Sequence, residues 1–131
     1  MNNVSRLHRT LALAVVVFAG ATAAQAPSIK RTILQRVDIG NNMEMILGMA
    51  EIAPGGSTGR HTHFGVETGY ILRGVGTLEM AGQPTRTLNV GDSYVIPAGA
   101  VHDAKATGKE ASQVLAVYVV EKGKPLATPA Q

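Results

Sequence analysis

Short apolar, β-type runs alternate with clusters of Gly, Pro and Asn along most of this chain. The clusters favour tight turns, because Gly and Asn tolerate a positive φ and Pro fixes φ. The runs predicted as strands are 29–37, 43–53, 69–73, 76–80, 85–88, 93–96, 101–106 and 112–121. From residue 28 onward no stretch combines a 3.6-residue apolar period with capping residues. The pattern therefore predicts an all-β domain, either a sandwich or a closed barrel.

The N-terminal segment has a different pattern. Basic residues at Arg6 and Arg9 precede an unbroken apolar run at 11–19, and small residues follow at 21–26. This order predicts a secretory signal peptide. The apolar run is too short for a membrane span, which needs about 20 residues. We therefore expect cleavage between residues 23 and 26 and no stable membrane anchor, and an anchor that is never removed is the alternative.

Length and composition allow one domain after this leader, because 131 residues are too few for two. The expected division is a signal peptide at 1–23, a barrel at 27–121 and a C-terminal tail at 122–131. The tail contains Gly and Pro without a period, so we expect it to be loose or to lie along a neighbour. No Cys is present, which excludes disulfides and thiolate ligands.

The positive charge of the chain belongs mainly to the leader. The whole chain carries +3, from 12 Lys and Arg against 9 Asp and Glu. Without Arg6 and Arg9 the balance is 10 against 9, or +1. The remaining basic residues form no run and are not interleaved with aromatic residues, so we expect no nucleic-acid partner.

Candidate chemistry is concentrated in two stretches. His61 and His63 are separated by one residue, so in a strand they project from the same face, and Glu67 follows closely. Two imidazoles and a carboxylate on one face form the beginning of a metal site, and His102 supplies a fourth candidate ligand. The fourth histidine of the chain, His8, lies in the predicted leader.

The spacing of these residues resembles the paired motifs of the cupin superfamily. The first motif, G-x5-H-x-H-x3-E-x6-G, is matched by Gly55, His61, His63, Glu67 and Gly74. The second, G-x5-P-x-G-x2-H, is matched by Gly91, Pro97, Gly99 and His102. One departure is Ala106, where the family often has Asn, which is not a ligand. The resemblance implies a double-stranded β-helix, a jelly-roll barrel, and a metal bound by His61, His63, Glu67 and His102.

The ligand set accepts Fe, Mn, Ni, Co, Cu or Zn as divalent ions, with affinities that rise along the Irving–Williams series. The leader lacks an Arg-Arg pair and so resembles a Sec signal. We therefore expect a periplasmic or secreted protein that acquires its metal after export. There copper or zinc outcompetes iron on affinity, so we expect zinc, copper or manganese ahead of iron.

Beyond the metal ligands the sequence indicates no acid or base for catalysis. Arg73 is on the Glu67 face but roughly 20 Å along the strand, at about 3.3 Å per residue. Gly69 is the nearest neighbour of Glu67 on that face and is expected to leave room for a ligand. Possible wall residues are Tyr118, Gln113 and Glu51. The parity of Met43, Met45 and Met49 favours core filling over copper binding.

Three functions remain open at this point. One is a small metal-dependent enzyme of the dioxygenase, isomerase or lyase type, acting on a compact oxygen-rich organic acid or sugar derivative. Another is a non-catalytic periplasmic module that binds a metal or a small ligand. A structural protein that uses only the outer sheet is a third possibility. We also expect a homodimer, formed through sheet edges or the exposed outer sheet.

Overall fold

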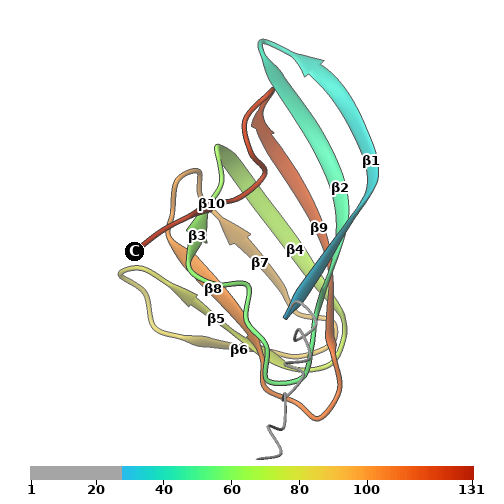
Figure 1. Cartoon of the computed structure of the whole chain (residues 1–131), viewed down its shortest axis with the longest axis vertical. Helices are drawn as coiled ribbons and strands as arrows, with labels where there is room; N and C mark the ends of the chain where they lie inside the picture. The colour runs from blue at the N-terminus through green and yellow to red at the C-terminus, as the bar shows by residue number, and fades with distance from the viewer. Residues whose placement is uncertain (1–27) are drawn as a thin grey trace, which may run out of the picture.

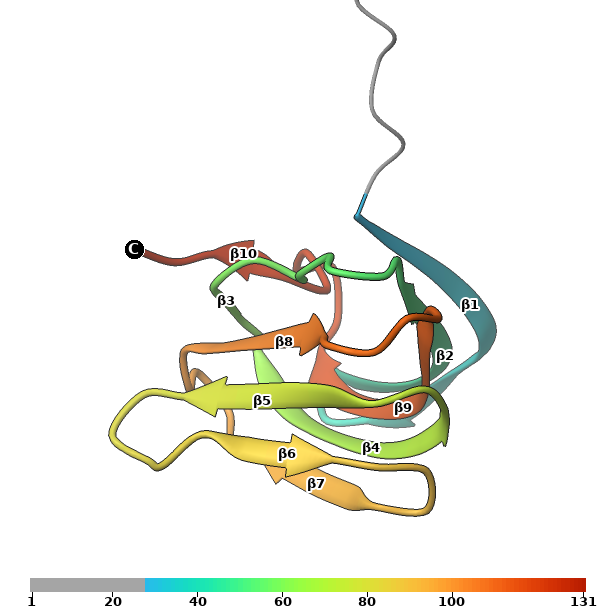
Figure 2. The same cartoon turned by 90° about the horizontal axis from the view of Figure 1, so that it is seen from below.

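The computed structural model describes residues 28–131, so the predicted signal peptide and its cleavage region lie outside the described residues. The described chain forms two five-stranded antiparallel sheets that face each other (Figure 1 and Figure 2). The strands are β1 (Ile29–Gly40), β2 (Met43–Ile52), β3 (His61–Thr62), β4 (Gly65–Arg73), β5 (Gly76–Met80), β6 (Arg86–Leu88), β7 (Ser93–Ile96), β8 (His102–Ala106), β9 (Ser112–Glu121) and β10 (Thr128–Pro129). This confirms the predicted all-β fold. Within this part of the chain there is no helix long and apolar enough to cross a membrane.

The order of strands in each sheet brings distant parts of the sequence together. The first sheet has the order β1-β2-β9-β4-β7, and the second has the order β10-β3-β8-β5-β6. In the first sheet β2 pairs with β9 along its whole length, from Met43 opposite Glu121 to Ile52 opposite Ser112. Both ends of the described chain, β1 and β10, are therefore edge strands, one in each sheet (Figure 1).

The core lies between the two sheets and is built from alternate positions of each strand. Ile46 of β2 and Ile96 of β7 are each 1% exposed, and Leu78 of β5 covers them from the second sheet at 2%. Gly74, which has a φ of +75°, lies at the corner between β4 and β5. A Cβ there would lie 2.7 Å from the carbonyl oxygen of Ala111, so only Gly fits this corner.

The methionines of β2 are an exception to the predictions. Met43, Met45 and Met49 do share one face, but it is the outer face, because Glu44, Ile46, Ala50 and Ile52 are the buried positions of this strand. Core filling is therefore wrong for these three residues. Strand parity shows which residues share a face, but it does not show which of the two faces is buried.

The outer face of the first sheet exposes apolar side chains. Met45 lies opposite Val119 on the next strand, and Val119 lies opposite Val66 on the strand beyond it. These three residues are between 36% and 42% exposed. A row of this kind leaves apolar area in contact with water, and it belongs to the surface through which a homodimer was predicted. The dimer stays a prediction.

The C-terminal tail lies along a neighbouring strand, which is one of the two placements predicted for it. Its last strand, β10, pairs with β3, so that Thr128 lies opposite Thr62 and Pro129 lies opposite His61. Leu126 packs against the core from its edge, and the amide of Ala130 donates to the carbonyl of Arg60 at 3.0 Å. Pairing at a free sheet edge gives the tail an ordered place that Gly and Pro content does not reveal.

Candidate metal centre

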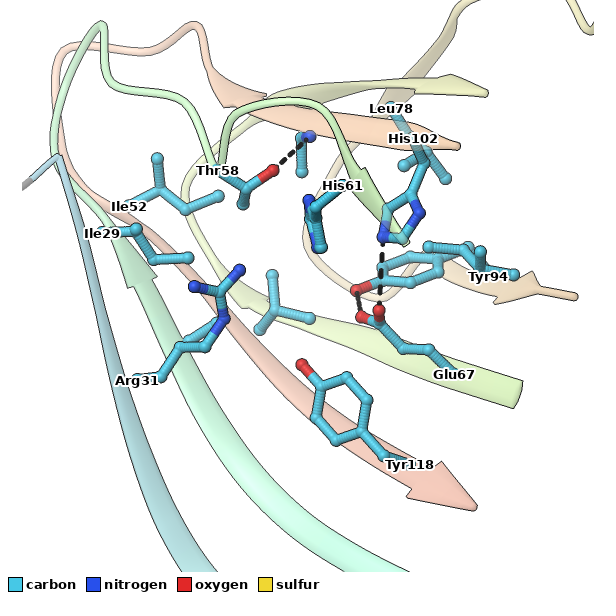
Figure 3. Close-up of a pocket in the computed structure, with 14 residues that line it drawn as sticks. Ile29, Arg31, Ile52, Thr58, His61, Glu67, Leu78, Tyr94, His102 and Tyr118 are labelled. Atoms are coloured by element: carbon cyan, nitrogen blue, oxygen red, sulfur yellow. Dashed lines mark hydrogen bonds and ion pairs between the residues drawn. The ribbon is translucent and has the colours of Figure 1, made fainter. Parts of the chain in front are cut away.

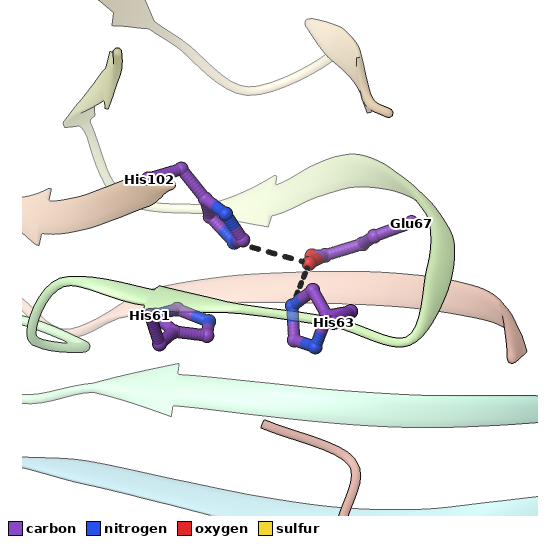
Figure 4. A group of neighbouring side chains, drawn as sticks. All are labelled: His61, His63, Glu67 and His102. Atoms are coloured by element: carbon purple, nitrogen blue, oxygen red, sulfur yellow. Dashed lines mark ion pairs between the residues drawn. The ribbon is translucent and has the colours of Figure 1, made fainter. Parts of the chain in front are cut away.

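Four side chains from three strands and one loop converge between the sheets. His61 belongs to β3, His102 lies opposite it on β8, Glu67 belongs to β4, and His63 is in the short connection between β3 and β4. One ligand atom from each residue lies within 4.8 Å of the corresponding atoms of the other three (Figure 4). Each residue is at most 6% exposed. The structure thus brings together the four side chains that the sequence predicted as ligands.

The turn after β7 connects the two sequence motifs. Pro97 and Gly99 form this turn, in which the amide of Ala100 donates to the carbonyl of Pro97 at 3.1 Å. The amide of Gly99 donates to the carbonyl of His63 at 3.0 Å. Gly99 has a φ of +73°, a conformation that side chains disfavour. The turn of the second motif therefore fixes the backbone of a ligand in the first motif.

Backbone carbonyls orient all three imidazoles in the same way. Nδ1 of His61 lies 2.7 Å from the carbonyl oxygen of Gly59, and Nδ1 of His102 lies 2.9 Å from that of Ala100. Nδ1 of His63 contacts the carbonyl oxygen of Leu126. A carbonyl oxygen only accepts, so each Nδ1 must carry the hydrogen. In the neutral imidazoles each Nε2 is then left with a free lone pair, which is the form that binds a metal.

The contact between His63 and Glu67 indicates that a cation belongs between the donors. Nε2 of His63 lies 2.7 Å from Oε2 of Glu67, yet this buried nitrogen has no hydrogen-bond partner. Nε2 of His102 lies 3.5 Å from the same oxygen. Ligands that are about 2.1 Å from one ion and at right angles to each other lie about 3 Å apart. The spacing and the chemistry of these donors therefore fit a divalent transition metal.

Tyr94 of β7 positions the carboxylate. Its hydroxyl donates to Oε1 of Glu67 at 2.7 Å, which leaves Oε2 directed toward the imidazoles (Figure 3). Gly69 lies opposite Tyr94 in the pairing of β4 with β7, and a Cβ at Gly69 would lie 2.3 Å from the tyrosine ring. The prediction that Gly69 leaves room for a ligand is wrong, because the ring of Tyr94 fills that space.

Burial and close contacts set the charge states at this site. Burial alone would raise the pKa of Glu67, but its contacts with His102, His63 and Tyr94 outweigh this and lower the pKa to about 2. Burial, with a smaller effect of the neighbouring imidazoles, lowers the pKa of His61 to about 4. Burial and the charge of Glu67 raise the pKa of Tyr94, and burial raises that of Tyr118. At neutral pH the glutamate is therefore ionised, His61 is neutral, and both tyrosines keep their protons.

A cavity of about 20 Å³ lies against these ligands. Its polar lining beyond them consists of Arg31, Thr58, Tyr94 and Tyr118, and aliphatic side chains form the rest (Figure 3). Such a volume holds one or two water-sized groups. The cavity can therefore admit one donor group of a ligand beside the metal position.

Of the three possible wall residues suggested by the sequence, one lines the cavity and two do not. Tyr118 lines the cavity. Gln113 and Glu51 alternate with the buried positions of their strands, so they lie on the outer face, where Gln113 donates to Glu51 at 2.7 Å. Arg73 pairs with Glu110 at 3.2 Å and does not line the cavity, as expected from its distance along the strand.

Three polar cavity residues, Arg31, Thr58 and Tyr94, were missed by sequence reasoning. For Tyr94 the strand parity was an available signal, because it alternates with the buried Ile96. For Arg31 the parity gave no clear signal, because Ile29 is only partly buried and Ile33 is 43% exposed.

The sequence matches a known family over residues 48–118, described as Cupin domain. This range is more than half of the chain and contains all four candidate ligands. The chain therefore belongs to the cupin family, and its two sheets form the cupin double-stranded β-helix.

Similar proteins agree with this assignment. The chain is 35% identical over 83 residues to germin-like protein subfamily 2 member 2 of Arabidopsis thaliana, covering 60% of this chain and 38% of that protein. It resembles DMSP lyase DddQ from Ruegeria pomeroyi with a TM-score of 0.67 and 19% identity, covering 79% of this chain and 52% of the lyase. A Klebsiella pneumoniae protein with a double-stranded β-helix domain gives a TM-score of 0.67 at 17% identity, covering 83% of this chain and 90% of that one. The chain thus spans well under two thirds of the germin-like protein and of the lyase.

Proposed function

We propose that this cupin binds one divalent transition metal through His61, His63, Glu67 and His102 and uses it as a small metal-dependent enzyme. The observation that carries this proposal is the shared orientation of the imidazoles. Each Nδ1 is engaged by a backbone carbonyl, so each Nε2 lone pair is free at a buried site that also holds an ionised carboxylate. Without a cation the ionised carboxylate and the Nε2 lone pairs repel one another in the interior, and a bound cation removes that repulsion.

The substrate class we propose is a compact oxygen-rich organic acid or sugar derivative. A bound metal would supply a Lewis acid for an oxygen donor of this substrate. The chain's own residues have supporting tasks: Tyr94 holds the carboxylate of Glu67, and the aliphatic lining of the cavity excludes bulk water. Both tyrosines keep their protons at neutral pH, so they donate hydrogen bonds and do not act as bases.

A reaction of the lyase, isomerase or dioxygenase type is consistent with this arrangement. The resemblance to a DMSP lyase supports the lyase type at the level of fold, and an oxalate oxidase is also similar in structure, with a TM-score of 0.63 at 20% identity. A shared fold does not select a reaction. The assignment therefore depends on a direct screen of substrates.

The second candidate is a module that binds a metal or small ligand without turnover. It is favoured by one observation: apart from the metal ligands, the cavity offers no side chain that is free to accept a proton. This candidate and the enzyme share the same metal centre and differ only in the fate of the ligand.

We further propose export to the periplasm or outside the cell, with zinc, copper or manganese bound ahead of iron. The support for export is the signal-like N-terminal sequence, and the support for zinc and copper is that both bind nitrogen and oxygen donors more tightly than iron does. N-terminal sequencing and metal analysis of protein recovered from the periplasm test both statements. Iron as the main occupant would contradict the metal preference.

The function is tested in two steps on the same preparation. Metal-free protein is titrated with zinc and manganese, and we expect uptake of one ion per chain that is lost in His63→Ala. The metal-loaded protein is then screened against hydroxy acids, keto acids, β-diketones, catechols and uronic acids, with oxygen consumption and mass spectrometry as readouts. Turnover that disappears in His63→Ala supports the enzyme, and binding without turnover supports the binding module. Absence of metal uptake overturns both.

A further inference from the structure

The metal centre adjoins a second hollow that is much larger than the cavity described above. This hollow, here called the vestibule, has a volume of about 350 Å³ and is lined by Arg31, Thr58, Arg60, His61, Ala127 and Pro129, among others. Three of these residues, Arg31, Thr58 and His61, also line the inner cavity, so the two spaces meet. Because the inner cavity has a volume of only about 20 Å³, the main part of any organic ligand must lie in the vestibule.

The vestibule carries two positive charges. Arg31 and Arg60 line it, and among residues 28–131 no Asp or Glu does, although ionised Glu67 lies in the adjoining inner cavity. Neither guanidinium forms an ion pair with any residue between 28 and 131. Of the other described arginines, Arg36 contacts Glu44 at 3.0 Å and Arg73 contacts Glu110, whereas Arg86 has no ion pair. A hollow with two unpaired cations attracts anions.

Arg31 stands where these two spaces meet. It lies opposite Ala50 in the pairing of β1 with β2, and Ala50 is a buried inner position. Its side chain therefore points toward the inside of the sandwich, and it lines the inner cavity together with His61 and Tyr118 (Figure 3). From this place it can contact a ligand that reaches the metal ligands.

We propose that Arg31 is the residue that selects the ligand, by binding the carboxylate of a short-chain acid whose second oxygen donor lies at the metal centre. This inference rests on the proposed metal binding. Arg60, at the outer side of the vestibule, attracts the same anion but contacts it less closely.

Charge and geometry both favour this class of ligand. A divalent metal and Glu67 together carry +1, and Arg31 raises the total to +2, so an anionic ligand lowers the excess charge. A guanidinium presents parallel N–H groups that match the two oxygens of a carboxylate. A neutral ligand of the same size would leave that donor pair unused.

The test compares acids with their neutral amides on metal-loaded protein. Affinities for malonate and malonamide, and for lactate and lactamide, are measured by calorimetry in the wild type, Arg31→Gln, Arg60→Gln and Lys30→Gln. Lys30 precedes Arg31 on β1 and alternates to the other face, so its substitution removes the same charge without touching the vestibule. We expect Arg31→Gln to weaken carboxylate binding about 10-fold to 100-fold, as the loss of a charge-assisted bidentate contact implies. Amide binding should be unchanged.

The remaining results separate this proposal from the proposed function. Arg60→Gln should have a smaller effect that fades with added salt, and Lys30→Gln should have none. Metal uptake, measured first in each variant, should match the wild type. If the metal binds normally but Arg31→Gln loses acids and amides equally, or behaves like Lys30→Gln, the role of Arg31 is refuted while metal binding stands. Failure of the wild type to take up metal overturns the proposed function, and this inference with it.

Discussion

The carbonyl of Leu126 is a contact that the C-terminal tail makes with the side chain of a metal ligand. It accepts the hydrogen of Nδ1 of His63 and so holds that imidazole with Nε2 toward the other ligands. The test is removal of residues 126–131, compared with Leu126→Ala in the full chain. The truncation removes the carbonyl, whereas the point substitution keeps the carbonyl and removes only the side chain.

The two variants should differ in metal affinity. Both should lose the stability that the Leu126 side chain contributes. Loss of a hydrogen-bonding partner of a ligating histidine typically weakens metal binding 10-fold to 100-fold. We expect that loss in the truncation and less than about a threefold change in Leu126→Ala. Leu126 is partly buried, so removing its side chain should cost about 1 kcal/mol of folding free energy. For a domain of this size that lowers Tm by about 5 °C.

Competition with a chromogenic chelator gives the metal affinities, and thermal unfolding of the metal-free proteins gives the stabilities. The truncation should also lose the pairing of β10 with β3, so its Tm should fall further than that of Leu126→Ala. Equal metal affinities for the truncation and Leu126→Ala would refute the reasoning, because the carbonyl would then have no part in orienting His63.

Two further predictions concern Tyr94 and acid pH. Tyr94→Phe removes the 2.7 Å hydrogen bond to Glu67 and should weaken metal binding about tenfold, with little change in the far-UV circular dichroism. An unchanged metal affinity would show that packing alone holds the carboxylate. The folded state keeps His61 neutral down to about pH 4, whereas the unfolded chain protonates it below its ordinary value of 6.5. Because the unfolded state then binds more protons, the stability of the metal-free protein should fall as pH decreases from 6.5 to 4. Glu67, with its pKa lowered to about 2, acts in the same direction below pH 4.5. Urea unfolding at a series of pH values should show this fall in the free energy of unfolding, and His61→Gln should reduce the fall between pH 6.5 and 4. A fall of equal size in His61→Gln would assign the effect to other groups.

Much of the fold could be predicted because the turn residues divide the chain at the correct places. The runs predicted at 93–96 and 112–121 match β7 and β9 in full, and the run predicted to begin at residue 43 begins with β2. The four candidate ligands could be predicted from motif spacing, and the structure brings them together. The features that the sequence did not predict depend on contacts between distant segments. Three of these features are the buried face of β2, the pairing of the tail with β3 and the position of the Tyr94 ring over Gly69. Each depends on a segment that is distant in sequence and therefore could not be predicted from the local pattern.

Two residues that contact the metal centre or its vestibule lie outside the part of the chain that matches the family. The family match covers residues 48–118, which include every candidate metal ligand and also Tyr94. Arg31 comes before this range, on β1, and the carbonyl of Leu126 comes after it, just before β10. Residues from both ends of the described domain, Arg31 of β1 and Pro129 of β10, line the same vestibule. If Arg31 binds the carboxylate of the ligand, as proposed, a substitution on β1 changes the ligand preference while the four metal ligands stay in place, and this is the outcome that Arg31→Gln tests.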